Sequence, residues 1–441
     1  MKRLILSALW AAMAMAPAAA GAQTVDGSTG ATARSAQQTP PDEATRPASR
    51  LLLGGYGEAV MSRMFYSSNY KRYTNASLYS DADGYGQFDI PHVVFFVGYD
   101  FGRGWTMNSE IEFEHGGTES AIEIEEEETG EYESEIERGG EVAIEQFWLQ
   151  KSFSDALNVR VGHMVVPVGR TNAHHMPTEF FTVYRPEGES TILPCTWHET
   201  GLSLWGQSGQ WRYEAMFLAG LDADRFGSQN WVGSGAGSPY EFKMGTCYAG
   251  AFRIDNTSVP GLQLSLSGYV GTSASNSLKP DAYSKVKGLV TIGSLDFMYG
   301  RRNCLVRGGV VYGHLTDSEK ITAINMSTRS DSPSPKTPIA SDAMAASVEA
   351  GYDLFSLAAR QVEPQLFAFV RYDFYDSMFR TEGSMTDNEC WGRQCVVAGF
   401  NYFPIRDLVV KAEFSHRIFR SQYNNENTLS FGIAYSGMFN L

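Results

Sequence analysis

Hydrophobic and polar residues alternate along most of the chain, from about residue 51 to its end. In the segment 408–418, one face carries Val410 and Phe414, and the other face carries Lys411 and Glu413. The segments 105–115 and 364–374 alternate in the same way. A period of two residues is typical of β-strands that have one apolar and one polar face. The pattern therefore predicts an all-β fold.

Short and long interruptions of this alternation follow each other in regular order. The short ones fall near 102–104, 154–156, 207–210, 256–260, 300–302, 357–361 and 404–407. The long ones fall near 62–86, 116–140, 167–196, 222–244, 274–287, 315–340, 377–392 and 420–427. These seven short and eight long breaks separate sixteen strands. An even strand number, with short turns at one end and long loops at the other, predicts a transmembrane antiparallel β-barrel of the outer membrane.

Composition agrees with a barrel. The chain has 441 residues, with Gly 44, Phe 26, Tyr 22 and Trp 8, and its mean hydropathy is only −0.25. Lipid-facing and lumen-facing residues cancel in such an average. Beyond residue 22, no uncharged apolar run reaches the length of a membrane-spanning helix.

The first residues predict export. Lys2 and Arg3 precede an apolar stretch at 4–20, and Ala20-Gly21-Ala22 supplies the small residues of a cleavage site. The apolar run is too short and too rich in small residues to favour an uncleaved membrane anchor. We therefore expect a signal peptide at 1–22, a flexible leader at 23–50 and an outer-membrane β-barrel at 51–441.

Charge and motifs exclude several function classes. A net charge of −15 without a basic stripe argues against nucleic-acid binding. Nucleophile elbows, phosphate-binding loops and C-x-x-C motifs do not occur. Ser415 and His416 are adjacent, so they point to opposite faces of a strand and cannot act together. We predict neither enzymatic activity nor a cofactor.

Five cysteines leave at least one thiol unpaired within the chain. Cys390 and Cys395 are close enough in sequence for a loop disulfide, and Cys195 and Cys247 fall at strand ends on one rim. Cys304 is the candidate for the unpaired thiol.

One stretch carries a family resemblance. An R-x-G-x-x-x-x-P-x-G strand holds Arg160, Gly162, Pro167 and Gly169, and a long loop leads from it to Thr200-Gly201. This arrangement resembles the phosphate-selective porin O and P family, in the version found in Bacteroidetes. The resemblance implies a sixteen-stranded channel that forms a homotrimer. It also implies that the third external loop, here 167–196, folds into the lumen and narrows it.

The candidate constriction follows from this resemblance. The loop carries both charge signs, and opposed charges across a narrow opening select solutes by size and charge. A surface loop that packs over the rim is the alternative. The residues concerned are Arg170, His174, His175, Glu179, Arg185, Glu187 and Glu189.

The family's phosphate preference does not carry over. The sequence shows no ladder of basic residues, and the inward face of the third strand carries Glu110, Glu112 and Glu114. Arg160, Arg212, Lys411 and Arg417 partly offset these acids. The preference for cations or anions therefore stays open.

Two groups of residues suggest ion binding. His174, His175 and Glu179, with His198 and Glu199, are suitable zinc ligands, but their spacing matches no zinc motif, so we favour polar pore lining and predict no metal. Residues 119–138 contain ten glutamates. They would bind Ca²⁺ or Mg²⁺ and bridge to lipopolysaccharide, or form a solvated loop.

These observations together predict a porin for passive diffusion of small hydrophilic solutes or ions. Outer-membrane lipid and lipopolysaccharide are its expected surroundings. The alternative is a structural or adhesive barrel whose acidic external loop is the contact surface.

Overall fold

The computed structural model describes residues 50–116, 142–237, 243–277, 281–301, 303–327, 336–358 and 363–439, together with the backbone of 119–127 and 131–139. The predicted signal peptide, and the leader except for its last residue, lie outside the described residues. No helix in the described part of the chain is both long and apolar enough to cross a membrane.

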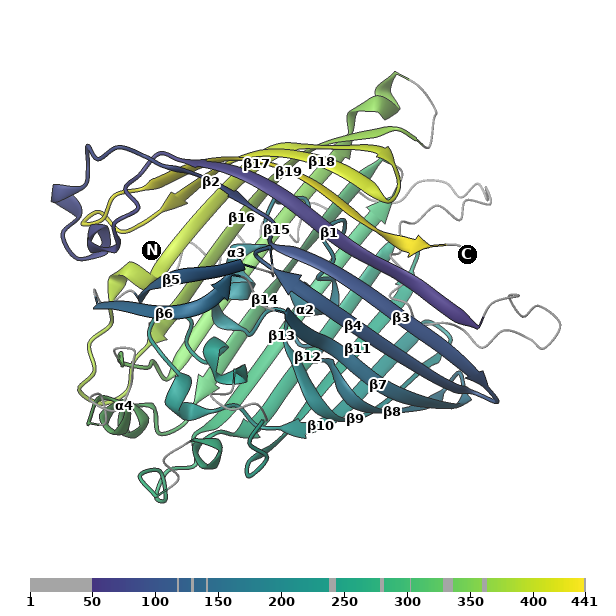
Figure 1. Cartoon of the computed structure of the whole chain (residues 1–441), viewed down its shortest axis with the longest axis horizontal. Coiled ribbons are helices and arrows are strands. Elements are labelled where there is room, and N and C mark those ends of the chain that lie inside the picture. Colours follow the sequence, from purple (N-terminus) through teal and green to yellow (C-terminus); the bar gives the residue numbers. More distant parts are fainter. Residues whose placement is uncertain are drawn as a thin grey trace. The chain divides into compact units, whose positions relative to one another are not determined.

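Antiparallel strands form one closed sheet, in which each strand pairs with its neighbours along the chain and β1 pairs with both β3 and β19 (Figure 1). The strands of this sheet are β1 (Leu51–Met64), β2 (Gly86–Asp89), β3 (His92–Gly102), β4 (Trp105–Glu114), β7 (Val142–Ser154), β8 (Leu157–Val165), β9 (His198–Ser208), β10 (Trp211–Ala219), β11 (Tyr248–Val259), β12 (Leu262–Thr272), β13 (Leu289–Arg301), β14 (Cys304–Leu315), β15 (Asp342–Asp353), β16 (Gln365–Arg380), β17 (Gly392–Ile405), β18 (Leu408–Ile418) and β19 (Glu426–Phe439).

The 17-stranded sheet is a barrel of sixteen strands, because β2 and β3 act as one. Both pair with β1, and between them the register moves by one residue, from Val60↔Asp89 to Gly57↔Val93. Pro91 lies at this step and has no backbone N–H to donate to the ladder. The predicted fold class and strand number are therefore confirmed.

The two faces of the strands differ as the alternation predicts. On β16, Val370 is 52% exposed and Arg371 only 6%; on β18, Phe414 is 45% exposed and Glu413 only 8%. The exposed face is apolar, which is the surface a bilayer requires, and the buried face is polar. The same outward face carries Phe147, Val161, Phe217, Leu266, Phe400 and Phe431.

Tight turns join the strands at one end of the barrel. In the turn between β3 and β4, Gly102 and Gly104 have φ of 82° and 75°, a region that favours glycine. A Cβ on Gly104 would also lie 2.6 Å from the carbonyl oxygen of Ser152. The turns between β7 and β8 and between β9 and β10 hold only residues 155–156 and 209–210.

The long breaks at the other end contain more regular structure than the sequence suggested (Figure 1). The stretch 116–140 was expected as loop, yet it forms a hairpin of β5 (Glu119–Glu127) and β6 (Glu131–Gly139). The alternation of isoleucine and glutamate at 122–125 has the period of a strand, and the register of the hairpin pairs Ile122 with Ile136. The described helices are α2 (Arg170–Ala173), α3 (Glu187–Ile192) and α4 (Ser318–Ser327), with 3-10 turns at η2 (Tyr70–Tyr73), η3 (Ala76–Leu78), η4 (Ala223–Arg225), η5 (Gly233–Ala236), η6 (Ala274–Asn276), η8 (Leu354–Leu357) and η9 (Glu389–Trp391).

The hydrophobic core is formed where several of these loops pack against inward-facing strand residues. Trp197 and Trp231 from loops are fully buried beside Val290 of β13 and Leu315 of β14. Loop residues therefore fill part of the barrel interior at this end.

The considered disulfides do not form. Cys195, Cys247, Cys304 and Cys395 are all free thiols, so neither the pairing of Cys390 with Cys395 nor that of Cys195 with Cys247 is present.

Candidate functional site: the lumen constriction

The segment 166–197, here named the lumen loop, lies inside the barrel. Its residues contact inward-facing side chains of strands that are far apart in the sheet: Ser267 on β12, Glu145 on β7 and Lys411 on β18. The helix α3 of this loop packs against β15 and β16. A loop that only covered the rim would not reach these positions.

A glycine fixes the start of the lumen loop. Gly169 has a φ of 83°, and its N–H donates to the Oγ of Ser267 at 3.0 Å. Its carbonyl oxygen accepts from Nη1 of Arg253 at 3.1 Å. A Cβ at this position would lie 2.0 Å from Oε1 of Glu189. Only glycine therefore fits here, which gives this position of the sequence motif a structural reason.

A buried lysine anchors the middle of the loop. Nζ of Lys411 donates to the carbonyl oxygens of Phe180 at 3.1 Å and Thr182 at 2.7 Å. The next strand residue on the same face, Glu413, accepts from the backbone N–H of Val183 at 2.8 Å. These charge-assisted hydrogen bonds hold the loop backbone against β18.

An aromatic side chain anchors the same stretch of the loop to another part of the barrel wall, at β15 and β16. Phe181 stacks on Phe369 of β16 with ring centroids 5.3 Å apart. The guanidinium of Arg307 lies 4.4 Å from the centroid of the Phe181 ring. Gly351 of β15 leaves the space for this ring, because a Cβ there would lie 2.4 Å from it.

Arginines and carboxylates pair along the inward faces of β8 to β16, and we name this region the arginine wall. Arg253 contacts Asp255 at 2.8 Å and Asp296 at 3.1 Å, and Arg371 contacts Asp373 at 2.7 Å. Arg307 also pairs with Glu349. Its members are Arg160, Arg212, Arg253, Arg307 and Arg371, with Glu214, Asp255, Asp296, Glu349 and Asp373.

Carboxylates line the inward faces of β1, β4 and β7, and we name this region the acidic wall. Its members are Glu58, Glu110, Glu112, Glu114 and Glu145. Among the described residues, no lysine or arginine forms an ion pair with any of them; the imidazole of His92 lies within 4.0 Å of Glu58, Glu112 and Glu114, and that of His175 within 4.0 Å of Glu145. The lumen loop thus lies between a wall of paired charges and a wall of mostly unpaired negative charges.

The predicted constriction residues fall into separate places. His174 and Glu179 contact each other at 3.2 Å, and Arg170 donates to the backbone oxygen of Glu179 at 3.4 Å. Burial lowers the pKa of Arg170 to about 10. His175 instead points to the acidic wall, with Nε2 3.8 Å from Oε1 of Glu145. Arg185 is half-buried in the loop, and its buried Nη2 has no hydrogen-bond partner in the described part of the chain.

The two loop glutamates differ from the expectation that both line the opening. Glu187 is partly exposed and pairs with Arg417 of β18 at 2.6 Å. Glu189 is only 8% exposed and accepts from the backbone N–H of Thr171 at 2.8 Å. Burial raises the pKa of Glu189 to about 7. Glu189 is thus part of the loop's interior and does not line the opening, because α3 turns it under Gly169.

Arg160 also lies away from the loop. It stands near the short turn at the start of β8, where its guanidinium covers the ring of Trp148 at 4.5 Å and its Nη1 lies 3.6 Å from Glu214. It lines the lumen wall below the constriction. Of the predicted acidic lining, Glu112 is buried at 4% exposure, and Glu110 and Glu114 are half-buried on the same face of β4.

The loop and strand residues considered for a zinc site do not come together. His198 contacts His163, with 2.5 Å between Nδ1 and Nε2. Glu199 pairs with Lys243 at 2.9 Å. His174 pairs with Glu179 and His175 with Glu145, so the five residues occupy four places.

Several lumen residues were missed in the sequence. Glu58, His92 and Glu145 join the acidic wall, and Arg253 and Arg307 join the arginine wall. The signal was only partly available: Arg253 shares its face of β11 with Asp255, whereas His92 shares its face of β3 with Val94 and Phe96. What the sequence does not give is which polar faces meet across the barrel.

Comparisons with known proteins agree with this architecture. The solved structure of Salmonella typhi OmpF in complex with daunomycin has a TM-score of 0.52 and 10% sequence identity, over 87% of this chain and 97% of that one. Pseudomonas putida OprB has a TM-score of 0.50 and 10% identity, over 87% and 94%. An anion-selective porin from Comamonas acidovorans has a TM-score of 0.49 and 9% identity, over 88% and 99%. The first two of these likenesses show that the chain has the fold of outer-membrane porins.

Sequence comparisons reach less far. No family model matches the chain. An uncharacterised protein of Aquifex aeolicus is 31% identical over 172 residues, which are 39% of this chain. The matched part spans 33% of the length of that relative.

Proposed function

We propose that this protein is an outer-membrane porin, through which small hydrophilic solutes or ions diffuse passively. The observation that carries the proposal is the lumen loop, held inside a closed barrel between the arginine wall and the acidic wall. The acidic wall faces a wall whose charges are paired, so it attracts cations across the lumen, and the loop that narrows the lumen rejects large solutes. The apolar outward face gives the barrel its place in the bilayer.

The same geometry supports a narrow channel with a preference for cations. The charges of the arginine wall largely cancel, since each guanidinium lies within 4.0 Å of a carboxylate. The acidic wall has no such compensation by lysine or arginine in the described residues. A mobile cation therefore meets a net attractive wall, and an anion does not.

Conductance tests this function. Purified protein in planar bilayers should give discrete channel openings, and its reversal potential in a KCl gradient should indicate preference for K⁺. Liposomes that contain the protein should swell in solutions of small sugars, and they should swell more slowly in solutions of larger sugars. Correctly inserted protein without conductance and without swelling would refute the channel and would leave a structural or adhesive barrel.

We further propose membership of the phosphate-selective porin O and P family, with a homotrimeric assembly. The support is the motif around Arg160 and Gly169, together with the inward course of the loop that follows it. Light scattering of the protein in detergent, corrected for bound detergent, should give three times the mass of one chain. A monomeric mass would contradict the trimer without affecting the channel.

A further inference from the structure

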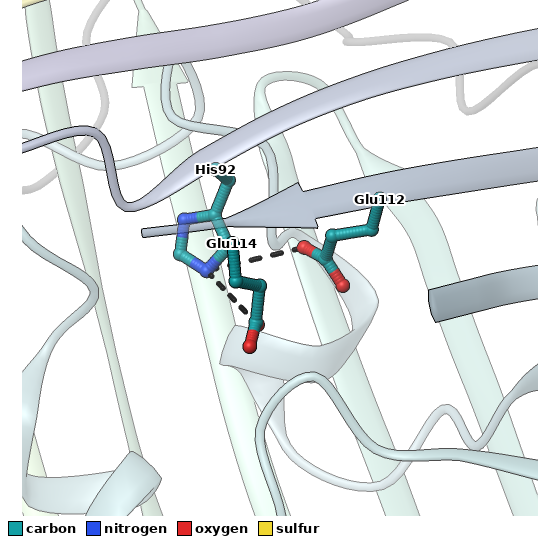
Figure 2. A group of neighbouring side chains, drawn as sticks. All are labelled: His92, Glu112 and Glu114. Atoms are coloured by element: carbon teal, nitrogen blue, oxygen red, sulfur yellow. Dashed lines mark ion pairs between the residues drawn. The ribbon is translucent and has the colours of Figure 1, made fainter. Parts of the chain in front are cut away.

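Four side chains from three adjacent strands meet on the acidic wall. His92 begins β3, and Glu114 lies directly opposite it at the end of β4. Glu112, two residues earlier on β4, points to the same face, and Glu58 comes from β1 on the other side of β3. Figure 2 shows His92, Glu112 and Glu114 turned toward one another.

The distances leave space for an ion between these groups. Nε2 of His92 lies 3.7 Å from Oε1 of Glu114 and 4.0 Å from Oε1 of Glu112 (Figure 2). Both distances are too long for a hydrogen bond. Zinc bonds of about 2.1 Å at tetrahedral angles place two ligand atoms about 3.4 Å apart. The two distances from Nε2 exceed this separation by 0.3 and 0.6 Å, and the three ligand atoms all lie within 4.8 Å of one another, so small side-chain rotations would bring them to a shared ion.

Glu58 orients the imidazole for this role. Its Oε1 lies 2.8 Å from Nδ1 of His92, a distance at which an Nδ1–H donates to the carboxylate. In that tautomer the lone pair of Nε2 faces Glu112 and Glu114. A carboxylate behind the distal ring nitrogen is the usual support of a metal-bound histidine.

A buried carboxylate oxygen in the cluster lacks a partner. Oε1 of Glu112, the atom that faces Nε2 of His92, accepts no hydrogen bond within the described residues, and the side chain is only 5% exposed. Oε2 of Glu58 is also buried without a partner. Leaving a buried charge unpaired is costly, and a bound cation would compensate it.

We propose that His92, Glu112 and Glu114 bind a divalent transition-metal ion of the zinc class, with Glu58 as the positioning residue. An imidazole among carboxylates suits Zn²⁺, whereas Ca²⁺ and Mg²⁺ prefer oxygen ligands alone. Three protein ligands leave one coordination position open. The side chain of Glu114 is 33% exposed, so an ion can reach the site from the loop end of the lumen.

Zinc binding to the intact, tag-free protein in detergent micelles tests the proposal, with Zn²⁺ alone as the titrant in a calorimeter. The wild type should bind one more equivalent than His92→Ala. Glu112→Gln and Glu114→Gln should each weaken binding at this site at least tenfold. Glu58→Gln should weaken it by about 10- to 100-fold. Ca²⁺ should not displace the bound Zn²⁺.

His314→Ala is the matched control. His314 pairs with a single carboxylate, Asp342 at 3.0 Å, but its side chain is 49% exposed and joins no such cluster of described residues. This variant should keep the full zinc stoichiometry. Other histidines, such as the contacting pair His163 and His198, give the same background in every variant.

Equal zinc stoichiometry and affinity in the wild type and His92→Ala would overturn the proposal, as would the absence of zinc binding to the wild type. Folding of each variant is verified by the difference in electrophoretic mobility between unheated and heated samples. If His92→Ala does not fold, the zinc affinity of Glu114→Gln decides the test, because the partly exposed side chain of Glu114 tolerates replacement by its neutral isostere. Zinc binding is measured without a membrane, so its failure is distinguishable from failure of the channel.

Discussion

Each wall of the lumen carries five carboxylates, and the two sets are in opposite states. On the arginine wall, guanidiniums and carboxylates satisfy one another, as in the contacts of Arg253 with Asp255 and Asp296. On the acidic wall, carboxylates face imidazoles, tyrosine and amides, and Oε1 of both Glu112 and Glu145 accepts no hydrogen bond from a described residue. Burial is similar, since Arg253 is 1% and Glu145 0% exposed.

This difference separates structure from selectivity. Paired buried charges act mainly on stability, because removal of one partner leaves the other uncompensated. Unpaired carboxylates destabilise the fold but attract cations, so their presence points to a role in binding or permeation. The lumen loop touches both walls, through Arg253 on one side and Glu145 on the other. Changes on the two walls should therefore have opposite consequences.

The largest expected effect is on stability, from Arg253→Met. The substitution leaves Asp296 buried without its bidentate partner and removes the donor to the carbonyl oxygen of Gly169. We expect a loss of about 3–5 kcal/mol in the free energy of unfolding. Urea titration of protein folded in lipid vesicles measures it.

Glu112→Gln on the acidic wall is the comparison for this variant, because it removes a charge of similar burial that has no cationic partner. Its stability should equal or exceed that of the wild type. Equal destabilisation by the two substitutions would contradict the distinction between the walls.

The sequence predicted the barrel well because its signals are local. Alternation places Val370 outward and Arg371 inward without knowledge of any other strand. The alternation of short and long breaks indicates which strand ends lie at the same end of the barrel. The constriction was predicted only in outline. Whether Glu189 faces water depends on α3 turning it under Gly169, which is a contact within the folded loop.

The composition of the walls shows the same limit. Arg307 and Glu349 stand 42 residues apart in the chain and pair across neighbouring strands. The sequence predicts inward-facing arginines such as Arg160 and Arg212 but not their pairing, so they were expected to offset the acids of β4 instead of neutralising carboxylates on nearby strands. Alternation gives the face of a strand, whereas electrostatic compensation needs the register.

A second prediction sharpens the comparison through ion selectivity. In the double variant Glu110→Gln and Glu112→Gln, the ratio of K⁺ to Cl⁻ permeability should fall by roughly fivefold per charge that borders the path, since a unit charge at about 4 Å contributes about 1 kcal/mol in water. Reversal potentials in a KCl gradient measure the ratio. Glu389→Gln in an exposed loop, 42% exposed beside Arg420, is the control and should leave it unchanged. An unchanged ratio in the double variant would remove the acidic wall from the permeation path.

A third prediction concerns the anchoring of the lumen loop. Lys411→Met removes both hydrogen bonds to the carbonyl oxygens of Phe180 and Thr182. Loss of these charge-assisted bonds weakens the anchoring by roughly 2–3 kcal/mol, so single-channel conductance and current noise should both rise. Lys320→Met on exposed α4 is the matched control. Conductance that stays at the wild-type value with a correctly folded barrel would show that this part of the loop does not narrow the opening.

The smallest expected effect is a pH dependence that originates from Glu189. Burial raises the pKa of its carboxyl to about 7, so the folded protein favours the neutral acid more than the unfolded chain does. The resulting stabilisation is complete below the unfolded pKa of about 4.3 and is lost as the pH rises through 7. The free energy of unfolding should therefore decrease between pH 5 and pH 8. In Glu189→Gln, which cannot ionise, this decrease should become smaller, and urea titrations at both pH values measure the difference. An identical decrease in the wild type and the variant would mean that Glu189 is ionised throughout this range, and that the loop accommodates its charge.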